Sequence, residues 1–194
     1  MKRTLIITTK ILIFLTGFTF AVYYFLDWGT VGKFAVSVGH SRLERTGMRM
    51  SYSDVTGTGE QDGFTVHNLI LNGAANISFG SVTIRPRIVS SILSMAAVCD
   101  ITFRNCSVRL GQSMNFGDGR FLLTAGRNEI LLENLSTNGE FALNGYMSID
   151  TGSMKIGRAD ARIDIPESFA GNMGMLQNFL PLVQEGDRWY LRRR

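Results

Sequence analysis

Apolar and polar residues alternate along most of the chain after residue 47. Residues 64–86, FTVHNLILNGAANISFGSVTIRP, form two alternating runs on either side of the pair Asn72-Gly73. Alternation with a period of two is typical of β-strands that bury one face, and Asn-Gly favours a tight hairpin turn. The pattern therefore predicts an antiparallel hairpin here, and similar runs predict further strands at residues 48–55, 99–110, 115–125, 128–136, 139–149, 153–165 and 187–194.

The alternation changes parity once within each of the two runs. Apolar residues stand at even positions up to Val66 and at odd positions from Leu69 onward, and the next run changes between Phe79 and Val82. A one-residue shift would turn the buried face of a strand outward, so each change predicts a β-bulge or a strong local twist. Farther along, Asp118-Gly119 is a second pair that favours a hairpin turn.

Helical periodicity first appears just ahead of the strands. Residues 30–46 place Val31, Phe34 and Val38 on one face, with charged residues elsewhere. This spacing predicts a short amphipathic helix whose apolar face is formed by those three side chains. Gly47 follows the last periodic residue and is expected to end the helix.

The order strand, proline, short helix then occurs twice. Pro86 and Pro166 are 80 residues apart, and each is followed by apolar residues at helical spacing. Pro86 suits the first position of a helix, and Pro181 is expected to stop the second one. This weak repeat suggests two similar β layers, each flanked by a helix, along one elongated sheet. The apolar positions are Val89, Ile92, Leu93 and Ala96 in the first copy and Phe169, Met173, Leu176 and Leu180 in the second.

The first 28 residues differ from everything that follows. An apolar run from Leu5 to Leu26 comes after Lys2 and Arg3, and its length is enough to cross about 30 Å of hydrocarbon as a helix. The leading basic residues favour a cytoplasmic N-terminus. A cleaved signal peptide is the alternative, but no small-residue cleavage site follows the run. The predicted anchor residues are Leu5, Ile11, Leu12, Ile13, Phe14, Leu15, Phe18, Phe20, Tyr23, Tyr24, Phe25 and Leu26.

These patterns predict a mainly β fold of the α+β class in three parts. Residues 1–28 are a cytoplasmic stub and a transmembrane helix, residues 29–47 an amphipathic linker helix, and residues 48–194 an elongated antiparallel β-sheet domain with short flanking helices. The chain has 194 residues, of which 45% are hydrophobic and 19% charged. That balance allows a packed core and argues against disorder. The net charge of +4, without a dense basic face, argues against a nucleic-acid partner.

The residues that could carry chemistry are few and scattered. His40 and His67 have no second histidine or cysteine at metal-ligand spacing, and no serine lies in a nucleophile elbow. Cys99 and Cys106 would stand roughly 23 Å apart on one strand, too far for a disulfide, so two small buried residues are expected. We therefore expect no enzyme, no metal and no cofactor.

The amphipathic sheet itself is the candidate functional object. An open edge can accept a strand from a partner, and a concave apolar face can hold acyl chains. The alternative is that the two helices close both faces of the sheet, which would leave no surface for a partner or a lipid. The residues expected to form a partner or lipid surface are Phe64, Val66, Ile77, Phe79, Ile101 and Phe103.

The order of these segments resembles a known family. An anchor, a helix, the block GFTVHNLILNGAANISFGSVTIRPRIVSSIL and the tail NFLPLVQEGDRWYL are similar to the N component of the type II secretion system, the general secretion pathway protein N family. They are more distantly similar to the AsmA-like envelope proteins. The resemblance implies a single-pass inner-membrane protein with a periplasmic β domain. It would be a non-enzymatic accessory whose partners are other secretion-system or envelope membrane proteins and membrane lipid.

One alternative of another class remains beside this resemblance. The bitopic periplasmic subunit of the lipopolysaccharide export bridge has a similar size, an anchor and an all-β periplasmic domain. A lipid or lipopolysaccharide handling protein would need a wide groove lined by the six apolar residues of the predicted surface. Small closed cores at those residues would argue against it.

Overall fold

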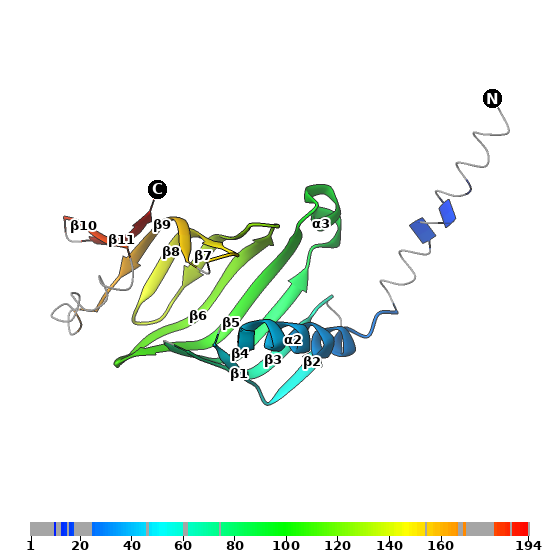
Figure 1. Ribbon diagram of the computed structural model, residues 1–194, viewed down its shortest axis with the longest axis horizontal. Coiled ribbons are helices and arrows are strands. Elements are labelled where there is room, and N and C mark those ends of the chain that lie inside the picture. The colour runs from blue at the N-terminus through cyan, green and yellow to red at the C-terminus, as the bar shows by residue number, and fades with distance from the viewer. Residues whose placement is uncertain are drawn as a thin grey trace, which may run out of the picture.

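The computed structural model consists mainly of one long, curled β-sheet with few helices (Figure 1). It describes residues 10, 13, 14, 16, 17, 25–45, 47–59, 62–73, 75–153, 155–166, 169, 181–186 and 188–193. The elements are α2 (Trp28–Arg45), β1 (Arg49–Ser51), β2 (Asp54–Gly57), β3 (Phe64–Asn72), β4 (Asn76–Pro86), α3 (Ile88–Ser94), β5 (Ala97–Leu110), β6 (Gln112–Ala125), β7 (Glu129–Thr137), β8 (Ala142–Asp150), β9 (Ile156–Asp164), β10 (Leu182–Glu185) and β11 (Arg188–Arg193).

The strands follow each other through the sheet almost in chain order. The described residues form an 11-stranded sheet in the order β1-β3-β4-β5-β6-β7-β8-β9-β11-β10, and β2 also pairs with β3. All the pairings are antiparallel. The prediction of a mainly β, antiparallel fold is therefore confirmed.

Of the two predicted hairpin turns, one is confirmed and the other is wrong. Asn72-Gly73 does join β3 to β4, where Asn72 pairs with Asn76. The hairpin predicted at Asp118-Gly119 is wrong, because both residues lie inside β6. The chain turns instead at Gly111, whose φ of +73° suits glycine, while a side chain at Gly119 would overlap the ring of Phe103 on the neighbouring strand.

A line of irregular backbone, here called the crease, crosses β3, β4 and β5 at Asn68, Gly80 and Asn105. Asn68 on β3 and Asn105 on β5 have φ values of 50° and 53°, and Gly80 of β4 lies between them by register. Next to Asn105, the β5–β6 register shifts between Phe103 and Cys106. The irregularity predicted in β3 is confirmed at Asn68, whereas the one at Asn105 was not predicted. Asparagine occupies both positions because it tolerates the left-handed region better than most residues.

A second irregularity of the same kind lies farther along the sheet. Asn134 on β7 has φ 53°, and the β7–β8 register shifts between Leu132 and Leu135. Each irregular asparagine has apolar residues four and two positions before it and one position after it, as at Ile101, Phe103 and Cys106 around Asn105. The extra residue keeps these side chains on one face and increases the local twist.

Helix α2 packs along β3 through its small residues. Gly32 and Val36 are its buried positions, and a Cβ at Gly32 would lie 2.6 Å from Cγ of Phe64. The face predicted for this helix is therefore wrong in part, because Phe34 is 72% exposed and Val38 is 41% exposed. The glycines let the helix backbone approach the strand closely, so they decide which face packs.

Helix α3 begins later than predicted. Pro86 is the last residue of β4, where it pairs with Cys99, and Arg87 is the residue that precedes the helix. The helix ends at Ser94, and the capping residue Met95 has a left-handed φ of 50°. None of its residues is buried, so the apolar spacing of this segment does not correspond to a buried face.

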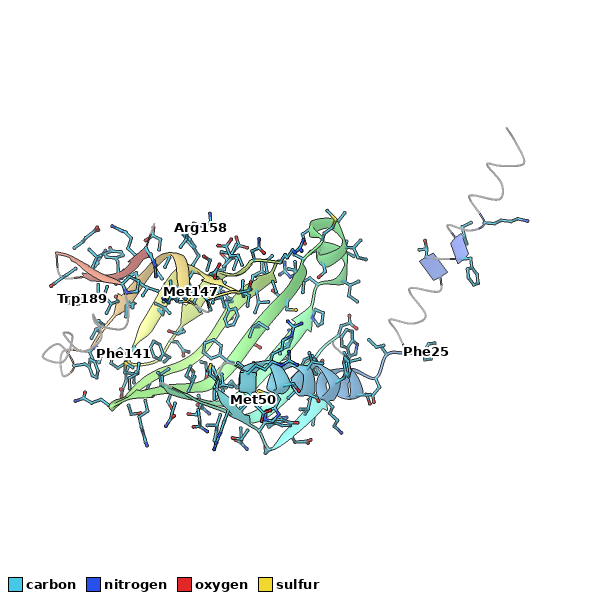
Figure 2. All side chains as sticks on the ribbon, in the orientation of Figure 1. Phe25, Met50, Phe141, Met147, Arg158 and Trp189 are labelled. Carbon is cyan, nitrogen blue, oxygen red and sulfur yellow. The ribbon has the colours of Figure 1, made fainter. Side chains whose placement is uncertain are left out.

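Buried side chains form four clusters on the apolar face of the sheet. One lies under α2, one is centred on Ile101 and Phe103, and one is formed by β9 and β11. In the fourth, Met114 and Phe141 pack with Trp189 of β11, so strands far apart in the sheet order share one core. The sheet therefore curls, and Figure 2 shows Phe141 and Trp189 at the end of the molecule far from Phe25.

The predicted anchor falls mostly outside the described residues. Of its twelve side chains, Ile13, Phe14, Phe25 and Leu26 are described. Within the described part of the chain, no helix has the length and apolar character needed to span a bilayer. The helix predicted after Pro166 also lies outside the described residues, apart from Phe169, and the strand β10 that follows it was not predicted.

The two cysteines are free thiols, as the sequence predicts. Cys106 is buried beside Val82, Ile101 and Phe103, and Cys99 is partly buried. Burial raises the pKa of Cys106 to about 11, and burial together with Asp100 raises the pKa of Cys99.

The crease predicts a specific sensitivity at Asn105. Asn105→Val places a β-branched residue in the left-handed region, and we expect the free energy of unfolding to fall by about 1 to 3 kcal/mol. Denaturant unfolding of the full chain in mild detergent measures the loss. Asn105→Gly should be tolerated. The matched control is Asn144→Val, an exposed strand position whose φ is not positive; an equal loss there would contradict this role for Asn105.

The raised pKa of Cys106 predicts slow, pH-dependent alkylation. The thiolate is the reactive form, and a pKa of about 11 leaves little of it at neutral pH. Labelling of Cys106 in the folded chain by iodoacetamide should therefore accelerate about tenfold per pH unit above neutrality. Peptide mass spectrometry measures both thiols, with the unfolded chain as the control. Rapid labelling of Cys106 near pH 7 would show that its burial is wrong.

Candidate functional site

The polar face of the sheet carries aligned rows of hydrogen-bonding side chains. Thr65 pairs with Thr83, Thr83 with Thr102, and Thr102 with Arg120, so one row crosses four strands. The hydroxyl groups of Thr65 and Thr83 lie 2.9 Å apart and are hydrogen-bonded. Such rows form because side chains at every second position point to the same face.

A second row runs beside the first. His67 pairs with Ser81, and Ser81 pairs with Arg104. On the adjacent strand, the Asp118 carboxylate accepts a hydrogen bond of 2.9 Å from the backbone N–H of Asn105. The crease therefore helps to position the acidic group that stands among these cations.

The two rows line a hollow in the polar face. Its volume is about 710 Å³, and an adjoining hollow of about 570 Å³ shares several of its walls. Both are lined by Arg85, Thr102, Arg120 and Ser136. The remaining polar residues of the larger hollow are Thr65, His67, Ser81, Thr83, Arg104, Asp118, Thr137 and Asn138.

The hollow carries more positive than negative charge. Arg85, Arg104 and Arg120 are exposed, and none forms an ion pair with a residue that the structure describes. Arg87 differs, because its guanidinium donates hydrogen bonds of 2.6 and 2.8 Å to both oxygens of Asp100. These hydrogen bonds raise the pKa of Arg87. Asp100 is therefore engaged, and the other three cations are available to a ligand.

This arrangement is suited to recognising carboxylates or other anions. A guanidinium offers a planar fork of donors that matches a carboxylate, and the threonine and serine hydroxyls can both donate and accept. The hollow is open and shallow along several strands, which fits an extended segment of another molecule better than a small enclosed ligand.

The apolar surface predicted from the sequence lies on the other face. Phe64 and Val66 are buried beneath α2. Ile101 and Phe103 are buried in the middle of the sheet, with Ile77 and Phe79 packed against them. The rings of Phe79 and Phe103 meet edge to face with centroids 5.6 Å apart. These side chains fill a core in this structure, and their use as a partner or lipid surface stays a prediction.

The histidines have local structural partners. His67 Nε2 is hydrogen-bonded to the hydroxyl of Thr56 at 3.0 Å, and His40 lies 3.6 Å from Glu44, one turn along α2. Among the described residues, no three histidine, cysteine or acidic side chains are grouped as metal ligands.

Sequence reasoning missed the polar hollow, although its signal was present. Thr83, Arg85, Thr102, Arg104 and Arg120 occupy the polar positions of the same alternation that identified the strands. Their alignment across strands depends on register, which the pattern of a single strand does not contain.

Comparison with known proteins identifies the family. The chain matches the family described as type II secretion system protein GspN-like, Synergistales, over residues 4–193. Searches of curated proteins and of solved structures found no match. The match covers nearly the whole chain and implies an accessory role in type II secretion, an envelope location and interaction with other secretion-system components. The chain therefore belongs to the GspN-like family of type II secretion system proteins.

Proposed function

We propose that this protein is a non-enzymatic scaffold of a type II secretion system, held at the inner membrane by its N-terminal segment. Its periplasmic β domain docks an acidic segment of another secretion-system component in the polar hollow. Family membership supports the role in secretion, and the geometry of the hollow supports the docking surface. The observation that carries the proposal is the presence in one hollow of three exposed arginines that form no ion pair with a described residue.

The membrane tether is supported by the sequence at the start of the chain. The apolar run from Leu5 to Leu26 is preceded by Lys2 and Arg3, which favours a single span with a cytoplasmic N-terminus. Helix α2 then begins at Trp28 and packs on the sheet. A tether of this kind raises the effective concentration of the β domain near membrane-bound partners.

The chemistry of the hollow supports an acidic protein segment as its occupant. Arg104 and Arg120 stand on adjacent strands, flanked by the hydroxyls of Thr83 and Thr102. An extended peptide with carboxylate side chains can meet the guanidinium groups while its backbone bonds to the hydroxyls. Complementary charge also speeds encounter between two components confined to the same membrane.

Lipid or lipopolysaccharide handling is the alternative, and it receives less support from this arrangement. Phe64, Val66, Ile101 and Phe103 are buried in closed clusters, whereas an acyl-chain site needs an accessible apolar groove.

The docking proposal predicts that charge reversal in the hollow abolishes partner capture. The double variant Arg104→Glu with Arg120→Glu should weaken co-purification of the secretion-system partner from membrane extracts by on the order of tenfold or more, because like charges across an interface cost several kcal/mol. Capture by the unaltered chain should also weaken with added salt. A photoreactive residue at Thr102 should crosslink to the same partner in cells.

The matched control is Arg109→Glu. Arg109 is also an exposed arginine of β5, but it does not line the hollow. Equal capture by the double variant and by the unaltered chain would refute docking in the hollow. Crosslinks from Thr102 mainly to phospholipid or lipopolysaccharide would move the function to lipid handling.

A further inference from the structure

Helix α3 presents its apolar side chains to solvent. Val89, Ile92 and Leu93 share one face at spacings of three and four residues, and they are 72%, 68% and 80% exposed. Met95, directly after the helix, is 94% exposed. Soluble proteins seldom expose so many large apolar side chains together unless the patch meets a partner or a membrane.

The Ser91 side chain of α3 bonds to the start of β5 instead. The Ser91 hydroxyl accepts a 2.9 Å hydrogen bond from the backbone N–H of Val98 and donates one of 2.9 Å to the carbonyl of Arg87. Ser94 donates a 2.7 Å hydrogen bond to the carbonyl of Ser90. Ser91 therefore satisfies the backbone where the helix joins β4 to β5, and no element among the described residues covers the apolar face.

The N-terminal segment leaves the domain at this same end of the sheet. Gly29, near the start of α2, lies against Gly57, and Gly32, one turn later, contacts Phe64 at the start of β3. Phe64 pairs with Ile84, two residues before the end of β4 at Pro86. Phe25, which precedes α2, is 88% exposed and points away from the sheet (Figure 2).

Basic side chains lie in other turns at the same end of the sheet as α3. Arg127 lies in the turn between β6 and β7, next to the start of β5, because Ala97 pairs with Ala125 and Ala125 with Ile130. Lys155 lies in the neighbouring turn between β8 and β9. Arg127 and Lys155 form no ion pair with any described residue.

The acidic groups of the same turns are occupied. Asp100 binds Arg87, and Glu129 binds Arg158 at 3.0 Å. Asp150 accepts hydrogen bonds of 2.7 Å from both the backbone and the hydroxyl of Ser153, which lower its pKa. The free charges on these turns are therefore cationic.

We propose that α3 is a second membrane contact, through which this end of the sheet rests on an anionic phospholipid surface. Val89, Ile92, Leu93 and Met95 enter the boundary between headgroups and acyl chains, as the apolar face of an interfacial helix does. Arg127 and Lys155, in turns at the same end of the sheet, meet the lipid phosphates. This inference rests on the proposed tether, since the N-terminal segment brings α3 to the bilayer.

A lipid surface fits this patch better than a protein partner. The patch combines a short apolar helix with cations on two separate turns, and it lies at the end of the sheet from which the predicted anchor extends. With the anchor in the bilayer, that end of the domain is the part nearest the headgroups. Two contacts would also fix the orientation of the sheet, which a single tether does not do.

The test uses the full chain, with Cys99→Ser and Cys106→Ala, in vesicles of phosphatidylethanolamine and phosphatidylglycerol. A fluorophore sensitive to polarity is attached to Leu93→Cys. Its emission should shift to shorter wavelength, and lipids that carry a nitroxide near the headgroup should quench most of it. The matched control is Ser113→Cys, an exposed position in the hairpin at the opposite end of β5 and β6, which should show neither effect.

A third label separates this inference from the proposed tether. Phe14→Cys reports the anchor through nitroxides placed deep in the acyl chains. Quenching at position 14 with none at position 93 would overturn the α3 contact and leave the tether standing. Absence of quenching at position 14 would overturn the tether instead. A photoreactive residue at Leu93 that crosslinks in cells to a protein rather than to phospholipid would also overturn the lipid assignment.

Discussion

A single sheet that carries most of the chain must hide one apolar face with very little helix to cover it. The described strands form one antiparallel sheet, and α2 covers only the part near β1, β2 and β3. The rest of the apolar face is closed because the sheet curls, so that Met114 and Phe141 pack with Trp189 from β11. Curling is the alternative to a second layer when a sheet has no other element to bury its face against.

The crease allows the sheet to curl while its apolar side chains stay on one continuous face. Asn68, Gly80 and Asn105 stand side by side across three strands, and the two asparagines have left-handed φ values. Each extra residue turns the following side chains back to the core and adds twist. The polar face follows the same geometry, because the residues between the buried ones form aligned rows. The arginine-lined hollow is thus a consequence of how the sheet hides its other face.

Helices α2 and α3 both depart from the orientation that their apolar spacing suggests. In α2, Gly32 packs on Phe64 while Phe34 is exposed. In α3, the Ser91 hydroxyl bonds to the backbone of Val98 in β5, while Ile92 and Leu93 are exposed. A helical pattern shows which residues share a face, but it does not show what that face will meet. In a protein proposed to lie against a bilayer, an outward apolar face is as reasonable as an inward one, since lipid replaces the core as the apolar medium.

The sequence by itself determined most of the strands, their antiparallel arrangement and the family. Alternation identified almost every long strand, and a parity change located the irregularity at Asn68, because the period of side-chain direction is a local property of the backbone. The asparagine between an outward and a buried residue, as in Arg104-Asn105-Cys106, was a readable signal. Only the tertiary structure decided which strands curl together, that Asp118-Gly119 lies within β6, that α2 packs through Gly32 and Val36, and that Arg104 and Arg120 share a hollow. These features depend on contacts and registers between segments distant in the chain, which the periodicity of one segment does not encode.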